Sequence, residues 1–219
     1  MSIKRDYLHG TKYSLLQVKD DYHFNQDTEL LGKFLKVYPN EEVLDIGTNQ
    51  GALLYYAFSK AKIKATGIDL FIEVLNRAKE NALYNKVDIT FICQPIQHYR
   101  EKKFDVILCN PPYFHSSLKN DNIYIDAARR DAYLSLDDLM LAVHDLLKAN
   151  GRFYLVHKVE KINLIMQKAF QVGITCSRMQ IVYNAKKAKT VLWEFKWGVK
   201  RECYVEKAIY LNEHRKDEK

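Results

Sequence analysis

The chain has 219 residues, 47% hydrophobic and 28% charged, which allows one well-buried core. Its first residues lack the apolar segment of a signal peptide, and no uninterrupted apolar run is long enough to span a bilayer. These properties argue against a secreted or membrane protein and predict a cytoplasmic one.

The net charge of +7 is concentrated in the last third of the chain. Residues 1–150 carry 19 Lys and Arg against 20 Asp and Glu, whereas residues 151–219 carry 15 against 7. Such a basic excess indicates a surface that faces a polyanion, because phosphate neutralisation dominates the affinity of proteins for nucleic acids. The alternative is a solvated lysine-rich surface that binds nothing.

The cysteines are widely spaced and form no CxxC pair; they are Cys93, Cys109, Cys176 and Cys203. We interpret all four as reduced structural thiols, and we predict neither a disulfide framework nor a metal site.

Residues 1–26 are polar and aromatic without a clear period, and a helix is predicted from an N-cap at Asp27 to about Tyr38. Gln26 lies just before this helix, where it can border a ligand pocket. A short buried strand, Val43–Ile46, leads into a glycine-containing turn over residues 47–51, and a helix is predicted from about Ala52 to Lys60.

This strand, turn and helix form the first βα unit of a doubly wound sheet, in which ligands bind beyond the carboxyl ends of the strands. The dinucleotide fingerprint G-x-G-x-x-G is absent, because Gly47 and Gly51 stand four residues apart with Asn49 between them. Asn49 tolerates a positive φ, so it can occupy a position usually held by glycine.

The second predicted strand, Lys64–Asp69, ends in an acid that can accept the hydroxyls of a ribose. The alternative role for Asp69 is an N-cap for the helix predicted over Phe71–Tyr84. The third strand, Asp88–Cys93, is followed by Gln94, whose amide can meet the edge of an adenine.

The fourth strand, Phe104–Cys109, runs into Asn110-Pro111-Pro112-Tyr113. Proline has no N–H and forces an extended conformation on the residue before it, so this turn presents carbonyl oxygens with few competing donors. The Asn110 side-chain oxygen and the Pro111 carbonyl suit the two hydrogens of an exocyclic –NH2, and Tyr113 suits stacking on a planar ring. An adenine base fits this description, although Asn-Pro alone is also a common turn signal.

Residues 114–133 are predicted to form a long loop that orders when substrate binds. A capping box at Ser135 and Asp138 begins a helix that is predicted to end near Asn150-Gly151. The elements predicted after it are a strand over Arg152–His157, a helix over Lys161–Phe170, apolar runs over Ile174–Tyr183 and Thr190–Trp197, and a short strand near Tyr204–Leu211. We therefore expect an N-terminal segment, residues 1–26, one α/β domain, residues 27–213, and a charged tail, residues 214–219.

These motifs together resemble the class I S-adenosylmethionine-dependent methyltransferases that act on exocyclic or amide nitrogens. The chain most resembles the bacterial tRNA (adenine-N6)-methyltransferases that modify the purine beside the valine anticodon. The resemblance rests on Phe24–Asp27, Leu44–Thr48, Asn110–Phe114, Leu136–Met140, Leu146–Lys148 and Gly151. It implies a single Rossmann-like domain with a mostly parallel seven-stranded sheet, S-adenosylmethionine as cofactor, and the anticodon loop of a tRNA as partner.

The resemblance also implies a role for each motif residue. The catalytic loop would be Asn110, Pro111, Pro112 and Tyr113. The cofactor would be held by Gln26, Asp45, Gly47, Thr48, Asn49, Gly51, Asp69, Leu70, Gln94 and Asn110. RNA would meet Phe114, Arg129, Arg130, Lys186, Lys187 and Lys189. The chain departs from the family at Asn49, where glycine is usual, and at Gln94, where aspartate is common.

Other functions remain open on the sequence. Ribosomal RNA is an alternative substrate. A second alternative is methylation of a protein glutamine, because release-factor glutamine methyltransferases also use Asn-Pro-Pro-Tyr. Those enzymes carry an N-terminal helical domain, and the 44 residues before Asp45 leave too little room for one. DNA adenine methyltransferases usually carry a separate target-recognition region. A non-catalytic RNA-binding protein on the same fold would bind the cofactor poorly, and a nicotinamide dehydrogenase is disfavoured by the missing fingerprint.

Overall fold

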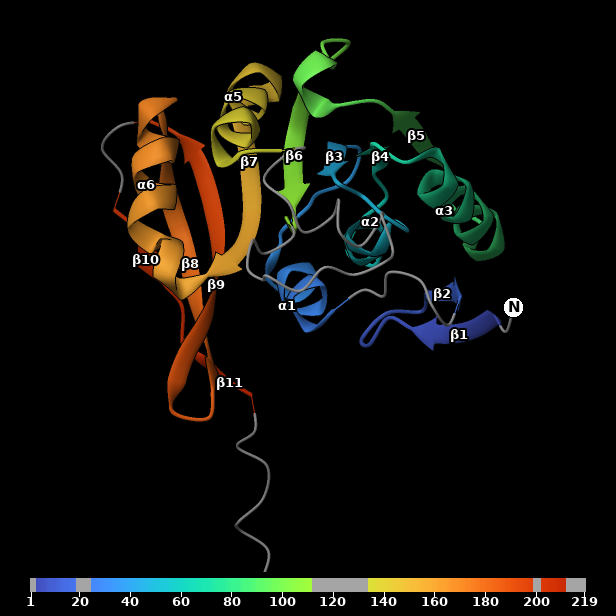
Figure 1. Ribbon diagram of the computed structural model, residues 1–219, viewed down its shortest axis with the longest axis horizontal. Helices are drawn as coiled ribbons and strands as arrows, with labels where there is room; N and C mark the ends of the chain where they lie inside the picture. Colours follow the sequence, from blue (N-terminus) through green and yellow to red (C-terminus); the bar gives the residue numbers. More distant parts are fainter. Residues whose placement is uncertain (1–2, 19–24, 112–133, 199–201, 212–219) are drawn as a thin grey trace, which may run out of the picture.

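A computed structural model describes residues 3–18, 25–111, 134–198 and 202–211. In these ranges the chain forms one large sheet with helices on both faces, and a small antiparallel hairpin lies beside it (Figure 1). The predicted doubly wound α/β fold is confirmed.

The large sheet contains seven full-length strands among the described residues. Their order across the sheet is β5 (Ile89–Cys93), β4 (Lys64–Asp69), β3 (Glu42–Ile46), β6 (Phe104–Cys109), β7 (Leu147–Lys158), β9 (Lys187–Trp197) and β8 (Ile174–Asn184). Only β9 runs against its neighbours in this set. Two further two-residue strands, β10 (Tyr204–Val205) and β11 (Ile209–Tyr210), pair with β8 where a single closing strand was predicted.

Side chains alternate between two hydrophobic cores, one on each face of the sheet. In β6, Ile107 and Cys109 belong to the core beneath α5 (Leu136–Leu146) and α6 (Ile162–Gln171), whereas Val106 and Leu108 face α1 (Gln26–Phe34) and α2 (Ala52–Phe58). A central strand that is buried on both faces needs a continuous apolar run, which is why the sequence showed β6 so clearly. The remaining helical elements are α3 (Ile72–Asn85) and two single 3-10 turns, Ile96–His98 and Val159–Lys161.

The N-terminal hairpin was not predicted. Its strands β1 (Ile3–Tyr7) and β2 (Ser14–Val18) pair in antiparallel register, and α3 holds β2 through two asparagines. The backbone N–H of Leu16 donates to Asn81 Oδ1 at 2.7 Å, and Asn85 Nδ2 donates to the Ser14 carbonyl at 2.8 Å. Because these partners lie 65 and 71 residues away in sequence, no local pattern marks the contact between the hairpin and α3.

The helix after the capping box ends earlier than predicted. Ser135 and Asp138 do form the capping box, but α5 stops at Leu146 and β7 begins at Leu147. The ladder between β6 and β7 shifts register between Leu147 and Arg152, so the residues between them bulge within the strand. The Asn150-Gly151 pair, which was interpreted as a helix stop, therefore belongs to this bulge.

The N-cap of α1 was also misplaced. Asn25 is the cap, with its side-chain oxygen accepting from the Thr28 N–H at 3.0 Å, and the helix ends at Phe34 rather than near Tyr38. The predicted cap, Asp27, is buried inside the first turn, where its carboxylate accepts a hydrogen bond from Thr190 Oγ1 at 3.3 Å. This contact joins the start of α1 to β9.

A buried ionic cluster joins the other end of α1 to the same part of the sheet. Arg178 of β8 donates from Nε to Glu194 Oε2 at 3.0 Å, from Nη2 to the Phe34 carbonyl at 2.9 Å and from Nη1 to Glu206 Oε1 at 2.6 Å. Its guanidinium lies 3.8 Å from the centre of the Phe34 ring, and Tyr154 Oη donates to Glu194 Oε2 at 3.0 Å. Helix α1 is thus fixed at both ends.

All four cysteines are unbonded, and the Sγ atoms of Cys176 and Cys203 lie 3.1 Å apart. Within the described part of the chain, no three His, Cys, Asp or Glu side chains gather closely enough to hold a metal ion. None of the helices in the described ranges combines the length and apolarity needed to cross a membrane.

Candidate functional site

Three strand ends meet at the carboxyl edge of the sheet. Ile46 pairs with Cys109 on one side and with Ile68 on the other, so the residues that follow these strands lie in a row. The chain proceeds from β3 outward to β4 and β5 and then returns to the opposite side of β3 with β6, which makes the β3–β6 boundary the switch point of the sheet. Ligands of doubly wound folds bind in the crevice at this point.

The turn after β3 has an unusual backbone. Gly47, Asn49 and Gly51 all have positive φ, at 67°, 50° and 86°. The expectation that Asn49 occupies a glycine-like position is therefore confirmed, because asparagine is one of the few residues that adopt this conformation readily. A Cβ added to Gly47 would meet no atom within 4 Å, so this part of the turn borders open space.

Asp45 and Thr48 form a buried pair beneath the turn. Thr48 Oγ1 donates to Asp45 Oδ2 at 2.9 Å, and Gly67 of β4 leaves room for this side chain, since a Cβ there would lie 2.8 Å from Thr48 Oγ1. Burial raises the pKa of Asp45 to about 8; the Thr48 hydrogen bond opposes this rise and the nearby charge of Asp69 adds to it. The other carboxyl oxygen, Oδ1, is buried and has no hydrogen-bond partner among the described residues.

The Asp69 carboxylate is held by backbone N–H groups. Asn49 donates to Oδ2 at 2.9 Å, while Leu70 and Phe71 donate to Oδ1 at 2.8 and 3.3 Å. The alternative role as a helix cap is wrong, because the N-cap of α3 is Phe71. Three of the four lone pairs of this carboxylate accept these hydrogen bonds, and the fourth accepts none from the described residues.

The remaining predicted cofactor residues border the same edge. Leu70 follows Asp69 directly, and Gln94, the residue after β5, donates its backbone N–H to the Asp69 carbonyl at 3.1 Å. Gln26 is exposed in the first turn of α1. No hydrogen bond joins the Gln94 side chain to the turn among the described residues.

Asn110 follows β6 beside Gly47, and its side chain points its nitrogen at α1. Asn110 Nδ2 donates to Thr28 Oγ1 at 2.8 Å and to Asn25 Oδ1 at 3.3 Å. Pro111 is buried next to it. The other members of the predicted catalytic and RNA-binding loop, Pro112, Tyr113, Phe114, Arg129 and Arg130, lie outside the described residues.

The predicted RNA-binding lysines, Lys186, Lys187 and Lys189, lie exposed at the tip of the β8–β9 hairpin, and we call them the arm lysines. Since β8 runs parallel to β7, this tip projects from the same edge of the sheet as Asn110, and it extends well beyond the ends of β6 and β7 (Figure 1). The adjoining aromatic pair, Tyr183 and Tyr210, was not predicted; the two rings stack with centroids 5.1 Å apart.

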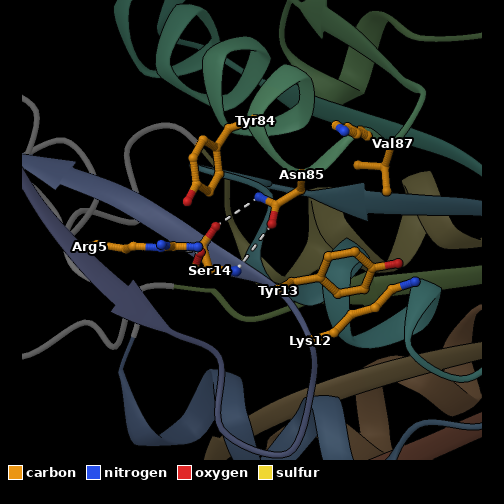
Figure 2. Close-up of a pocket in the computed structure, with 8 residues that line it drawn as sticks. Arg5, Lys12, Tyr13, Ser14, Tyr84, Asn85 and Val87 are labelled. Carbon is orange, nitrogen blue, oxygen red and sulfur yellow. Dashed lines mark hydrogen bonds between the residues drawn. The ribbon is translucent and has the colours of Figure 1, made fainter.

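An open pocket of about 500 Å³ lies away from these residues, between the N-terminal hairpin and α3 (Figure 2). Its polar groups bind one another: Arg5 Nε donates to Ser14 Oγ at 3.0 Å, and Asn85 bonds both backbone polar groups of Ser14. We interpret this pocket as part of the interface where the hairpin packs against α3.

The sheet has an open glycine turn at its switch point, an acid at the end of β4 and an amide after β6. This arrangement is typical of doubly wound enzymes that bind a nucleoside cofactor. A family model described as a methyltransferase domain matches residues 38–207, and the chain belongs to this family. The predicted class of enzyme, a methyltransferase, is thereby confirmed.

Two curated relatives share the same printed name, tRNA1(Val) (adenine(37)-N6)-methyltransferase. The chain is 29% identical to the one from Bacteroides fragilis (strain YCH46) over 191 residues, which are 84% of this chain and 80% of the relative. It is 32% identical to the one from Cytophaga hutchinsonii over 149 residues, 65% of this chain and 62% of the relative.

Among solved structures, the fold is similar to that of Pyrococcus abyssi tRNA (uracil-54, C5)-methyltransferase in complex with S-adenosyl-L-homocysteine. The TM-score is 0.63 at 14% identity, with 89% of this chain and 44% of that chain covered. At this identity the similarity concerns the fold alone.

Proposed function

We propose that this chain transfers a methyl group from S-adenosylmethionine to the exocyclic N6 nitrogen of an adenine in tRNA, at adenine 37 beside the anticodon of a valine tRNA. The observation that carries the proposal is the amide of Asn110, which stands beside the glycine turn at the switch point. Its nitrogen is bound to α1, and its oxygen is bound to none of the described residues. The names of the two curated relatives support the choice of nitrogen and of RNA. A tRNA substrate supports the proposal that the enzyme acts in the cytoplasm.

The residues around the turn fit the cofactor. The buried oxygen of Asp45 that lacks a partner suits the cationic amino group of the methionine end, which the backbone of Gly47, Thr48, Asn49 and Gly51 would border. Asp69 has one acceptor site left for a ribose hydroxyl, and Leu70, Gln94 and Gln26 would border the base. When bound, S-adenosylmethionine supplies an electrophilic methyl group.

Asn110 would make the target nitrogen reactive. The lone pair of an adenine N6 is delocalised into the ring, so that nitrogen is a poor nucleophile. Accepting its two hydrogens at Asn110 Oδ1 and the Pro111 carbonyl would favour a pyramidal nitrogen and stabilise the positive charge that develops on it. Fixing the base by stacking on Tyr113 would add the advantage of alignment. Neither a metal ion nor a covalent nucleophile enters this scheme.

The arm lysines and the Tyr183–Tyr210 pair would form the RNA surface, together with Phe114, Arg129 and Arg130. Exposed cations beside stacked aromatic rings suit phosphates and unpaired bases, and an anticodon loop offers both. Exposed lysines at the opposite edge of the sheet, Lys62, Lys64 and Lys103, provide a matched control set, which we call the amino-edge lysines.

Two transcripts of a valine tRNA test the proposal, one unmodified and one with guanine in place of adenine 37. The purified protein, given S-adenosylmethionine, should form N6-methyladenosine in the first transcript and none in the second, as measured by nucleoside mass spectrometry. Equal methylation of both transcripts would contradict the position, and no methylation of either would contradict the substrate.

A further inference from the structure

The amide of Asn110 has two ends with opposite chemistry. Its oxygen accepts hydrogen bonds and its nitrogen donates them, and a 180° turn of the side chain exchanges the two. The exocyclic amine of the substrate donates hydrogen bonds. Only the amide oxygen of Asn110 can accept them, because the amide nitrogen is itself a donor. The proposed reaction therefore requires one particular orientation of this amide.

The N-cap of α1 decides that orientation. Asn25 Oδ1 accepts from the Thr28 N–H at 3.0 Å, and an amide nitrogen cannot accept there, so this atom is the oxygen. The atom of Asn110 that lies 3.3 Å from Asn25 Oδ1 must then be a donor, because two acceptor oxygens at that distance repel each other.

Thr28 leads to the same assignment. Its hydroxyl lies 3.2 Å from Asn25 Oδ1, which can only accept, so the single hydroxyl hydrogen is directed there. Thr28 Oγ1 is left to accept from Asn110 Nδ2 at 2.8 Å. Because only 5% of Thr28 is exposed, water competes poorly for these contacts.

We propose that Asn25 and Thr28 are positioning residues of the methyl-transfer site, which hold the Asn110 amide so that its oxygen faces the substrate amine. The catalytic role assigned to this orientation rests on the proposed function. Helix α1 is a firm support for this task, since Asp27 is bound by Thr190 at its start and the Phe34 carbonyl is bound by Arg178 at its end.

Thr28→Val removes the hydroxyl with little change of shape, and Thr28→Ser keeps it. A neutral hydrogen bond corresponds to roughly a fivefold factor in an equilibrium, so we expect kcat to fall about fivefold or more in Thr28→Val, with the affinity for S-adenosylhomocysteine unchanged. Thr28→Ser should recover most of the rate. A serine variant as impaired as the valine variant, at equal thermal stability, would overturn the inference.

A second readout needs no activity. In protein labelled with ¹⁵N at asparagine, the side-chain NH2 signals of Asn110 are assigned by their loss in Asn110→Asp. They should shift and exchange faster with solvent in Thr28→Val and return toward the wild-type position in Thr28→Ser. Unchanged Asn110 signals in Thr28→Val would refute the proposal that Thr28 orients the Asn110 amide, even if the enzyme were impaired.

Asn25→Gly provides an independent variant should Thr28→Val fold poorly, because glycine is tolerated as an N-cap and Asn25 is exposed. It should move the Asn110 NH2 signals in the same direction, and signals that stay in place would refute the inference. If the wild-type protein methylates no RNA, the proposed function fails, while these signals still decide whether the cap orients Asn110.

Discussion

Replacement of Glu194 by glutamine should destabilise the protein substantially. Burial alone would raise the pKa of Glu194, but the charge of Arg178 and the hydrogen bonds from Lys196, Arg178 and Ser177 lower it from 4.5 to about 2. That difference corresponds to about 3 kcal/mol of stabilisation at pH 7, and breaking a buried ion pair generally costs about 3–5 kcal/mol. We therefore expect a loss of about 3 kcal/mol in the free energy of unfolding.

The effect should depend on pH with a definite sign. A carboxyl group whose pKa is lower in the folded state stabilises the protein above the unfolded pKa, and this contribution disappears as the pH falls toward the folded value. The gap between wild type and Glu194→Gln should therefore shrink by about 1 kcal/mol at pH 4 and about 2 kcal/mol at pH 3. Groups that titrate alike in both proteins cancel in this comparison.

Urea unfolding followed by circular dichroism measures the gap. Lys102→Met is the matched control, because Lys102 pairs with Glu42 at 2.7 Å near the surface, with 42% of the lysine side chain exposed. This exposed pair should contribute less than about 1 kcal/mol. A Glu194→Gln variant within 1 kcal/mol of wild type at pH 7, or a gap that stays constant down to pH 3, would refute the reasoning.

Three further predictions concern the candidate site. Asn110→Ala should abolish methyl transfer while leaving cofactor affinity within a few-fold in calorimetry, and retained turnover would exclude the assigned mechanism. Affinity for S-adenosylhomocysteine should rise about tenfold from pH 6 to pH 7, because burial raises the pKa of Asp45 to about 8 and the cationic amino group of the ligand favours the ionised carboxylate. This pH dependence should vanish in Asp45→Asn, and a wild-type affinity that does not change with pH would contradict the assigned role of Asp45. Changing the arm lysines to alanine should weaken tRNA binding and lower the slope of log K against log salt by up to about three, whereas changing the amino-edge lysines should not. An unchanged slope would place the RNA surface elsewhere.

The sequence predicted best what local chemistry determines. The strand bounds of β4 and β6 were predicted without error, because β6 carries the apolar run Val106–Cys109 directly before Asn110, and charged residues, Lys64 and Asp69, stand at the two ends of β4. The positive φ of Asn49 was likewise predictable, since few residues other than glycine tolerate it in a tight turn. The capping box at Ser135 followed from residue types three positions apart.

Features that depend on distant partners were missed. Asn25 rather than Asp27 is the N-cap of α1, and Asp27 instead contacts Thr190, a residue 163 positions away. Separation in sequence also concealed the orientation of Asn110, whose partners precede it by 82 and 85 positions. Arg129 and Arg130 lie outside the described residues, and their role in RNA binding stays a prediction.

The central claim is that this methyltransferase acts on an adenine N6 in tRNA. Its most direct test is methyl transfer from labelled S-adenosylmethionine to total RNA from a strain that lacks the gene, followed by nucleoside analysis of each RNA fraction. We predict that the label appears as N6-methyladenosine in tRNA. Label confined to ribosomal RNA, or absent from RNA while the cofactor still binds, would contradict the claim and direct attention to ribosomal adenines or to protein glutamine.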